Sequence, residues 1–131
     1  MKAKEVISTE KAPGAIGPYS QAIKIGSMLF CSGQIPLDPV TMTVVPGSIR
    51  EQTKQVMKNL SAVIQAAGLT MSHVVKTTIF VKDLATFAEL NAEYEAQLRE
   101  AGVKTFPARS TVEVARLPRD VLVEIEAICA E

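Results

Sequence analysis

Residues 48–81, SIREQTKQVMKNLSAVIQAAGLTMSHVVKTTIFV, combine an amphipathic helix pattern with a strand pattern, and this succession decides the fold class. Ser48 and Glu51 have the spacing of a capping box, which predicts that a helix begins there. The apolar residues of this helix recur at three- and four-residue spacing: Val56, Leu60, Val63, Ile64 and Ala67. Gly68 is suited to ending the helix. Residues 74–81 are rich in β-branched and aromatic side chains, which predicts a central strand.

Strand patterns also precede this unit. Residues 22–25 and 28–32 form two short apolar runs separated by Gly26 and Ser27, which predicts a tight hairpin. Residues 4–8 offer a further N-terminal strand. The sequence before the first helix is therefore expected to form two or three short strands.

A second helix and two more strands are expected after residue 81. Thr86 and Glu89 have the spacing of a second capping box, and the apolar stripe that follows ends near Gly102. Residues 108–115 and 121–128 then read as strands. The turn-forming RLPRD segment lies between them, so we expect these two strands to pair as an antiparallel hairpin.

The element order predicts an α+β domain in which both helices cover one face of a mixed sheet. On the central strand, Val75, Ile79 and Val81 are expected on one face, and Val74 and Phe80 on the other. Both faces would then be apolar although two helices can cover only one. The uncovered face is therefore expected to meet another subunit.

Composition limits the classes of function. The 131 residues fit a single domain spanning 1–131, and 14 acidic residues balance 14 basic ones, so neither nucleic acid nor a membrane is an expected partner. No apolar run is long enough to span a membrane, and the first residues do not resemble a secretion signal, which indicates a cytoplasmic protein. Cys31, Cys129 and His73 have no metal-binding spacing, so neither a metal nor a structural disulfide is expected.

The expected closing hairpin brings an arginine and a glutamate together. A loop centred between residues 117 and 118 would place Thr111 opposite Glu124 and Arg109 opposite Glu126. Arg109 and Glu124 would then be diagonal neighbours on one face, roughly 7–8 Å apart. An arginine binds a carboxylate through two N–H groups and a glutamate can activate water, which favours hydrolysis of a small 2-substituted acid. Pairing or solvation without chemistry is the alternative reading.

Several segments resemble one protein family. They are FPARSTVEVARLP (106–118), VEIEA (123–127), AIGPYSQ (15–21), SGQIP (32–36), AAGL (66–69) and VKTTIFVKDL (75–84). Together they closely resemble the Rid (YjgF) family over nearly the whole chain, and the arginine-containing segment resembles its RidA branch.

The resemblance implies a chorismate-mutase-like α+β fold with a mixed six-stranded sheet, assembled as a homotrimer whose sheets face inward and whose active sites lie between subunits. It implies a hydrolytic deaminase that needs no cofactor and converts reactive 2-imino or 2-enamino acids, such as 2-iminobutanoate and 2-iminopropanoate, to 2-keto acids and ammonia. Arg109 is expected to hold the substrate carboxylate, and Glu124 the attacking water. The other expected contacts are Tyr19, Ser32, Gly33, Asn91 and the backbone near Thr111. Many RidA proteins carry Cys in place of Thr111, and the exchange should preserve activity.

Other functions and roles remain open at this stage. The same clefts could bind metabolites or act as a holdase without turnover, and RNA cleavage is a further, less favoured alternative. Individual residues also have structural interpretations. Tyr19 could fill the core edge, Ser32 and Gly33 could form a turn, Asn91 could be solvated, and Glu126 could pair with Arg109. His73 is expected at the surface and Cys31 in the core.

Overall fold

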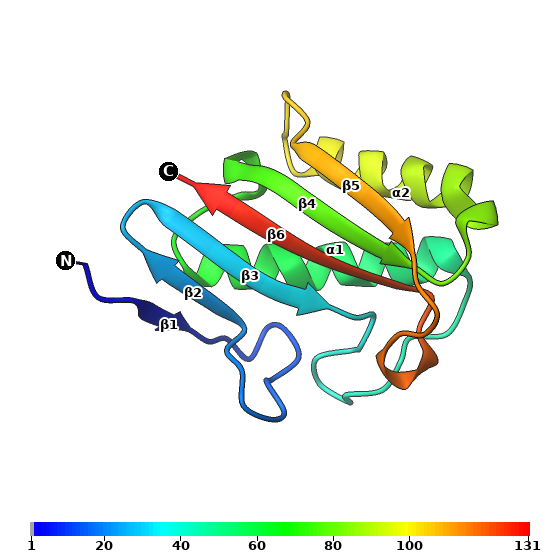
Figure 1. The fold of residues 1–131 in the computed structure, drawn as a ribbon, viewed down its shortest axis with the longest axis horizontal. Coiled ribbons are helices and arrows are strands. Elements are labelled where there is room, and N and C mark those ends of the chain that lie inside the picture. Colours follow the sequence, from blue (N-terminus) through cyan, green and yellow to red (C-terminus); the bar gives the residue numbers. More distant parts are fainter. Residues whose placement is uncertain (1) are drawn as a thin grey trace.

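The computed structural model describes residues 2–131 as a curved sheet backed by two helices (Figure 1). The strands are β1 (Glu5–Ile7), β2 (Ala22–Ile25), β3 (Met28–Gln34), β4 (Val74–Val81), β5 (Ala108–Glu113) and β6 (Val123–Ala130). The α-helices are α1 (Ile49–Ala66) and α2 (Phe87–Glu100), and short 3₁₀ turns are formed by Met71–His73, Leu84–Thr86 and Pro118–Asp120. No helix in the described part of the chain has both the length and the apolar character needed to cross a bilayer.

The sheet is mixed and has the strand order β1-β2-β3-β6-β4-β5. The connections β3-α1-β4 and β4-α2-β5 are helical crossovers, and β4 and β5 pair in parallel. The C-terminal β6 lies antiparallel between β3 and β4. Both helices lie on the same face of this sheet (Figure 1), which confirms the predicted α+β class. The predicted β2–β3 hairpin is also present.

Helix α1 begins as its sequence predicts. The Glu51 carboxylate accepts hydrogen bonds from the Ser48 backbone N–H at 2.7 Å and from the Ser48 hydroxyl at 3.0 Å. These bonds hold the pKa of Glu51 below its usual value. The apolar stripe of α1 is buried against the sheet, so local capping and tertiary packing favour the same helix.

The N-terminus of α2 differs from the prediction. Thr86 does not form a capping box with Glu89, because its backbone is not extended and its hydroxyl donates to the Asp83 carbonyl at 2.7 Å. Asp83 instead caps the preceding 3₁₀ turn by accepting from the Ala85 N–H at 2.9 Å. The 3₁₀ turn runs directly into α2, so the chain enters the helix one turn earlier than the sequence pattern indicates.

The predicted antiparallel hairpin between β5 and β6 is wrong. Strand β4 lies between them, pairing with β5 in parallel and with β6 in antiparallel orientation. Residues 114–122 are long enough to pass the end of β4, since two strand spacings amount to only about 9.6 Å. A turn signal shows that the chain reverses, but it does not show which strand lies beside the returning segment.

One irregularity in β4 changes the predicted faces. The register between β4 and β6 shifts between Val74 and Lys76, so Val74 is buried while Val75 is exposed. The sequence pattern groups Val75 with the buried Ile79 and Val74 with Phe80, so it assigns each valine to the wrong face. Beyond the shift the alternation is regular: Ile79 is buried under the helices and Phe80 lies on the other face, as expected.

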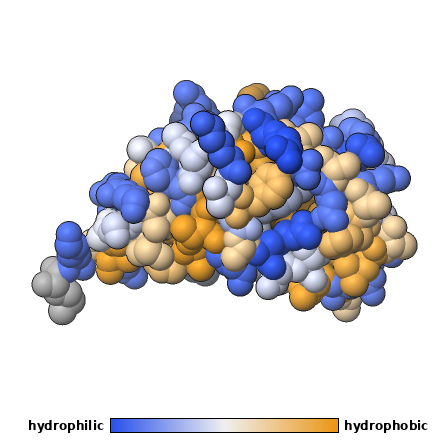
Figure 2. Space-filling view, turned by 90° about the horizontal axis from the view of Figure 1, so that it is seen from above, coloured by the Kyte–Doolittle hydropathy of each residue, from blue (hydrophilic) through white to orange (hydrophobic). Residues whose placement is uncertain are grey.

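The sheet face opposite the helices, called the open face below, carries exposed apolar side chains. Phe30 on β3 is 45% exposed and Val112 on β5 is 43% exposed, and the half-buried Phe80 and Ile128 lie on the strands between them. Hydrophobic residues gather along the lower side of the molecule in Figure 2, which corresponds to the face nearest the viewer in Figure 1. This surface is more apolar than a solvated sheet face requires.

Candidate functional site

Glu124 projects from β6 onto the open face. Its cross-strand partner on β4 is Phe80, whose side chain lies on that same face. On the other side Gly33 of β3 leaves space for the carboxylate. A Cβ at residue 33 would overlap a carboxylate oxygen of Glu124 and would lie 2.9 Å from its Cδ and 3.0 Å from its Cγ. The carboxylate therefore occupies the space that any larger residue at 33 would fill.

An irregularity in β3 brings further predicted residues to Glu124. The β3–β6 register shifts between Cys31 and Gln34, so Ser32 and Gly33 form a bulge rather than the turn considered as an alternative. The Ser32 hydroxyl donates to the Ser20 carbonyl at 2.6 Å, which attaches the loop containing Tyr19 to this bulge. The Tyr19 side chain does not fill the edge of the core, because Tyr19 is 53% exposed.

The surroundings of Glu124 stabilise its protonated form relative to its ionised form, compared with a glutamate exposed to water. Partial burial raises its pKa above the usual value, and the neighbouring negative charge of Glu126 raises it further. A carboxylate with a raised pKa is a stronger base when it is ionised. Glu124 is therefore suited to accepting a proton from water.

Arg109 lies in a second cluster, on the helix side of β5. Its Nη1 donates to the Asn91 Oδ1 at 2.6 Å, and its guanidinium carbon lies 5.3 Å from the ring centre of Phe87 and 5.4 Å from that of Tyr94. All three contacts come from α2. A pocket of about 330 Å³ adjoins the guanidinium and is bounded by α2, Phe106 and Pro107. Asn91 is thus a partner of Arg109 rather than a freely solvated residue.

Thr111 follows Arg109 on the same face of β5. Its Oγ1 is buried and has no hydrogen-bond partner among the described residues. A buried hydroxyl without a partner is unusual and costs stability. The Thr111 hydroxyl thus makes no hydrogen bond within residues 2–131.

The two clusters do not meet within one chain, which corrects the predicted geometry. Arg109 is paired with Thr77 of β4, which is buried under the helices, whereas Glu124 is paired with Phe80 on the open face. Paired residues on neighbouring strands share a face, so Arg109 and Glu124 lie on opposite faces with β4 between them. Glu126 is exposed opposite Thr78 and does not pair with Arg109.

The remaining candidates have structural surroundings. Cys31 and Cys129 are free thiols buried in the core, as expected for Cys31. The partly exposed His73 accepts a hydrogen bond from the Thr70 N–H at 3.0 Å through its Nδ1. No group of three or more potential metal ligands occurs among residues 2–131.

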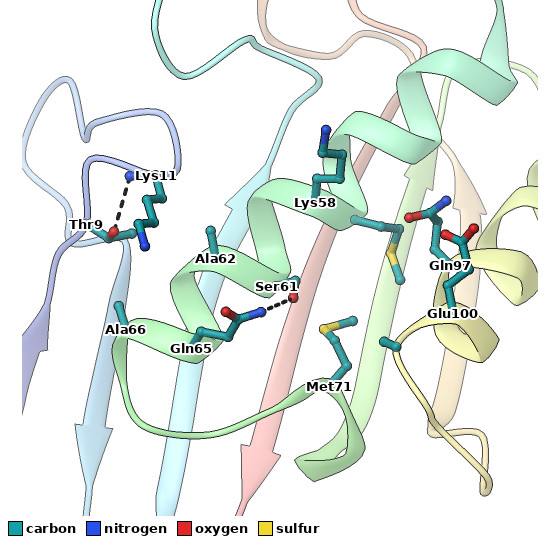
Figure 3. A pocket seen from close by; sticks show the side chains of 12 residues that line it. Thr9, Lys11, Lys58, Ser61, Ala62, Gln65, Ala66, Met71, Gln97 and Glu100 are labelled. Carbon is teal, nitrogen blue, oxygen red and sulfur yellow. Dashed lines mark hydrogen bonds between the residues drawn. The ribbon is translucent and has the colours of Figure 1, made fainter.

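A further hollow lies on the helical side of the molecule. Figure 3 shows this groove of about 550 Å³ between the outer surface of α1, the end of α2 and the segment containing Thr9 and Lys11. None of the predicted site residues lines it. The candidate chemistry is therefore confined to the two clusters described above.

Sequence reasoning missed the residues that hold the two clusters in place. The buried Gln21 fixes the N-terminal loop by donating to the Pro13 carbonyl at 2.8 Å and accepting from the Thr9 N–H at 2.7 Å. Phe87 and Tyr94 belong to the apolar stripe that predicts the second helix, and that stripe alone does not indicate their contact with Arg109. Their spacing with Asn91, at relative positions 1, 5 and 8 of one helix face, was the available signal.

Comparison with known proteins identifies the family. Residues 9–131 match the family described as Endoribonuclease L-PSP. The chain belongs to this family. A relative from Salmonella typhimurium named 2-iminobutanoate/2-iminopropanoate deaminase is 55% identical over 95% of each chain. Among solved structures, the YjgF gene product of Escherichia coli is 53% identical with a TM-score of 0.93. The match covers 97% of this chain and 98% of the YjgF chain.

A second structure of this family is described with a ligand. It is that of the Escherichia coli protein TdcF with bound serine. TdcF is 45% identical with a TM-score of 0.93, and the match covers 97% of this chain and 98% of the TdcF chain. Family membership confirms the resemblance that the sequence segments indicated, and the fold of these neighbours agrees with the sheet and helices described here.

Proposed function

We propose that this protein is a 2-iminobutanoate/2-iminopropanoate deaminase, which hydrolyses small 2-imino acids to 2-keto acids and ammonia. Relatives 54–55% identical over 95% of the chain bear this name. The observation that carries the proposal is the pair of groups suited to this chemistry. Arg109 is a cation whose Nε–H and Nη2–H groups have no hydrogen-bond partner among residues 2–131, and Glu124 is a partly buried carboxylate with a raised pKa.

The complete site is formed by two copies of the chain. Within one chain Arg109 and Glu124 lie on opposite faces of the sheet, so neither cluster alone combines a carboxylate anchor with a base. The apolar open face supports association with further copies. A homotrimer with its sheets facing inward places β5 of one subunit near β3 and β6 of the next. Arg109, Asn91 and Thr111 then face Tyr19, Gly33 and Glu124 across each cleft.

The reaction requires binding, proton transfer and loss of ammonia. The substrate carboxylate binds to the Arg109 guanidinium, and Glu124 removes a proton from water while the oxygen attacks the protonated imine carbon. The resulting carbinolamine receives that proton on nitrogen and the C–N bond breaks. Ammonia leaves and the hydroxyl proton passes to Glu124 as the ketone forms. Glu124 then gives this proton to the departing ammonia, which leaves as ammonium and restores the carboxylate. Positioning supplies much of the rate gain, because a protonated imine is already electrophilic.

The direct test follows 2-keto acid release while an amino acid dehydratase generates the imine in situ. The purified protein is expected to accelerate release over the spontaneous rate, and Arg109→Ala is expected to abolish the acceleration. Arg50→Ala is the matched control, because Arg50 is an exposed arginine on α1 outside both clusters. Full activity in Arg109→Ala would refute the assignment.

The Glu124→Gln variant separates catalysis from simple binding. It is expected to bind 2-oxobutanoate with nearly unchanged Kd, measured by calorimetry, and to lose turnover. Unchanged turnover would show that Glu124 is not the base. Binding of 2-oxobutanoate without any turnover by the wild-type protein would instead favour a metabolite-binding or holdase-like module. RNA cleavage that persists through repurification and in Arg109→Ala would point to a different activity at a different site.

A further inference from the structure

The side chain of Arg109 is held in place before any substrate binds. Asn91 accepts a hydrogen bond from the Arg109 Nη1, and the aromatic rings of Phe87 and Tyr94 lie within cation–π distance of the guanidinium. The hydrogen bond to Nη1 leaves Nε–H and Nη2–H, which point in parallel along the other edge of the guanidinium. That edge matches the two oxygens of a carboxylate.

The Tyr94 ring is itself fixed from the core. Its hydroxyl is hydrogen-bonded to the Thr77 hydroxyl at 2.7 Å, and both residues are buried, Thr77 completely. Thr77 is the cross-strand partner of Arg109 on β4. One residue of the central strand therefore lies beside Arg109 and also determines where the supporting ring lies. A valine at position 77 would fit the strand pattern equally well but would leave the tyrosine hydroxyl unpaired.

The geometry points to Tyr94 as a positioning residue that orients Arg109 for the substrate carboxylate, with Thr77 fixing its ring. This inference rests on the function proposed above. An arginine side chain that is free in solution loses rotamer freedom when it binds a ligand. With Asn91, Phe87 and Tyr94 already restricting Arg109, that loss occurs on folding, and carboxylate binding is strengthened.

The test measures binding of 2-oxobutanoate and of its neutral amide, 2-oxobutanamide, by calorimetry. Tyr94→Leu removes the ring and is expected to raise the Kd of the acid about 10-fold, because Arg109 then loses side-chain freedom when the acid binds rather than when the protein folds. Tyr94→Phe retains the ring and is expected to raise it only about 2- to 3-fold. The Kd of the neutral amide is expected to stay within a factor of two in both variants, because it forms no ion pair with Arg109.

Steady-state kinetics provide a second readout. Tyr94→Leu is expected to raise KM for the imine and to leave kcat within a factor of about two, since Glu124 and the water are untouched. Val63→Ala is the control for lost core packing, because Val63 is fully buried on α1 and does not line the pocket beside Arg109. It is expected to lower stability without changing either Kd.

The outcomes separate this inference from the proposed function. An unchanged Kd of the acid in folded Tyr94→Leu, an equal rise for acid and amide, or an equal rise in Val63→Ala would overturn the role of Tyr94. If the wild-type protein binds 2-oxobutanoate but does not accelerate imine hydrolysis, the deaminase proposal fails while the role of Tyr94 can still stand. If the wild-type protein binds no keto acid, both fail.

Discussion

Replacing Gly33 with alanine places a methyl group where the Glu124 carboxylate lies. The added Cβ would be 2.9 Å from the carboxylate carbon and closer still to one oxygen, whereas ordinary contacts begin near 3.4 Å. The Gly33 backbone is not in the left-handed region, so the substitution is not strained for that reason. One carboxylate oxygen of Glu124 must therefore move by about 1 Å, or the side chain must rotate away, and either change displaces the proposed base.

The expected loss can be estimated from the role proposed for Glu124. General-base catalysis contributes about 10²- to 10⁴-fold, and a displacement of about 1 Å can cost about 10²-fold. We therefore expect Gly33→Ala to lower kcat/KM for imine hydrolysis by about 10- to 100-fold, or roughly 1.4–2.7 kcal/mol. The assay is dehydratase-coupled keto acid release, with the spontaneous rate subtracted.

Two comparisons make this prediction specific. Gly14→Ala is the matched control, because a Cβ there meets no atom within 4 Å and Gly14 has no positive φ. In the Glu124→Gln background, Gly33→Ala should cost little further activity, since both changes act on one group. Equal activity of Gly33→Ala and Gly14→Ala would refute the reasoning, as would fully additive losses in the double variant.

Two further predictions concern stability. Because the folded-state pKa of Glu124 is raised, its ionisation destabilises the fold as pH rises from about 4.3 through that higher value. Glu124→Gln should therefore raise Tm relative to wild type at pH 7, with the difference disappearing below about pH 4; a Tm gain that is as large at pH 4 would contradict the assigned cause. Thr111→Val removes a buried unpaired hydroxyl and should stabilise the protein by about 1 kcal/mol, whereas Thr77→Val breaks the bond to Tyr94 and should destabilise it by about 1–2 kcal/mol. Urea unfolding of the two valine variants tests this pair, and equal destabilisation would show that Thr111 has a partner in the assembled protein.

The elements themselves could be predicted because their signals are local. Ser48 and Glu51 cap α1 as expected, and the bounds of β2 and β4 agree with the apolar runs at 22–25 and 74–81. The second predicted capping box failed because Thr86 continues a 3₁₀ turn that begins at Leu84. Capping patterns thus locate helices well but do not show what precedes the first turn.

The pairing of strands could not be predicted from the same signals. The RLPRD segment reverses the chain, and a hairpin explains it as well as a connection that passes over β4. β4 lies between β5 and β6 and pairs with Arg109 through Thr77 and with Glu124 through Phe80, so Arg109 and Glu124 occupy opposite faces rather than one. The register shifts at Val74 and at Ser32 and Gly33 depend on pairing with the distant β6, and Gly33, a glycine inside a strand, is the one local signal for a bulge among them.

The choice of site residues rested on resemblance more than on geometry. The sequence placed Arg109 and Glu124 in one chain's hairpin, whereas the structure separates them and groups Arg109 with Asn91, and Glu124 with Gly33. What spacing could show was that Phe87, Asn91 and Tyr94 share a helix face. It could not show which strand residue that face would meet.

Mixing two inactive variants tests most directly whether the site is shared between copies. Arg109→Ala and Glu124→Gln are co-expressed with different tags, and hybrids carrying both tags are purified and assayed for imine hydrolysis. In a cyclic trimer every hybrid contains one cleft with both residues intact, so hybrids should have about one third of wild-type activity. Hybrids as inactive as the parent variants would contradict a site built from Arg109 of one subunit and Glu124 of the next.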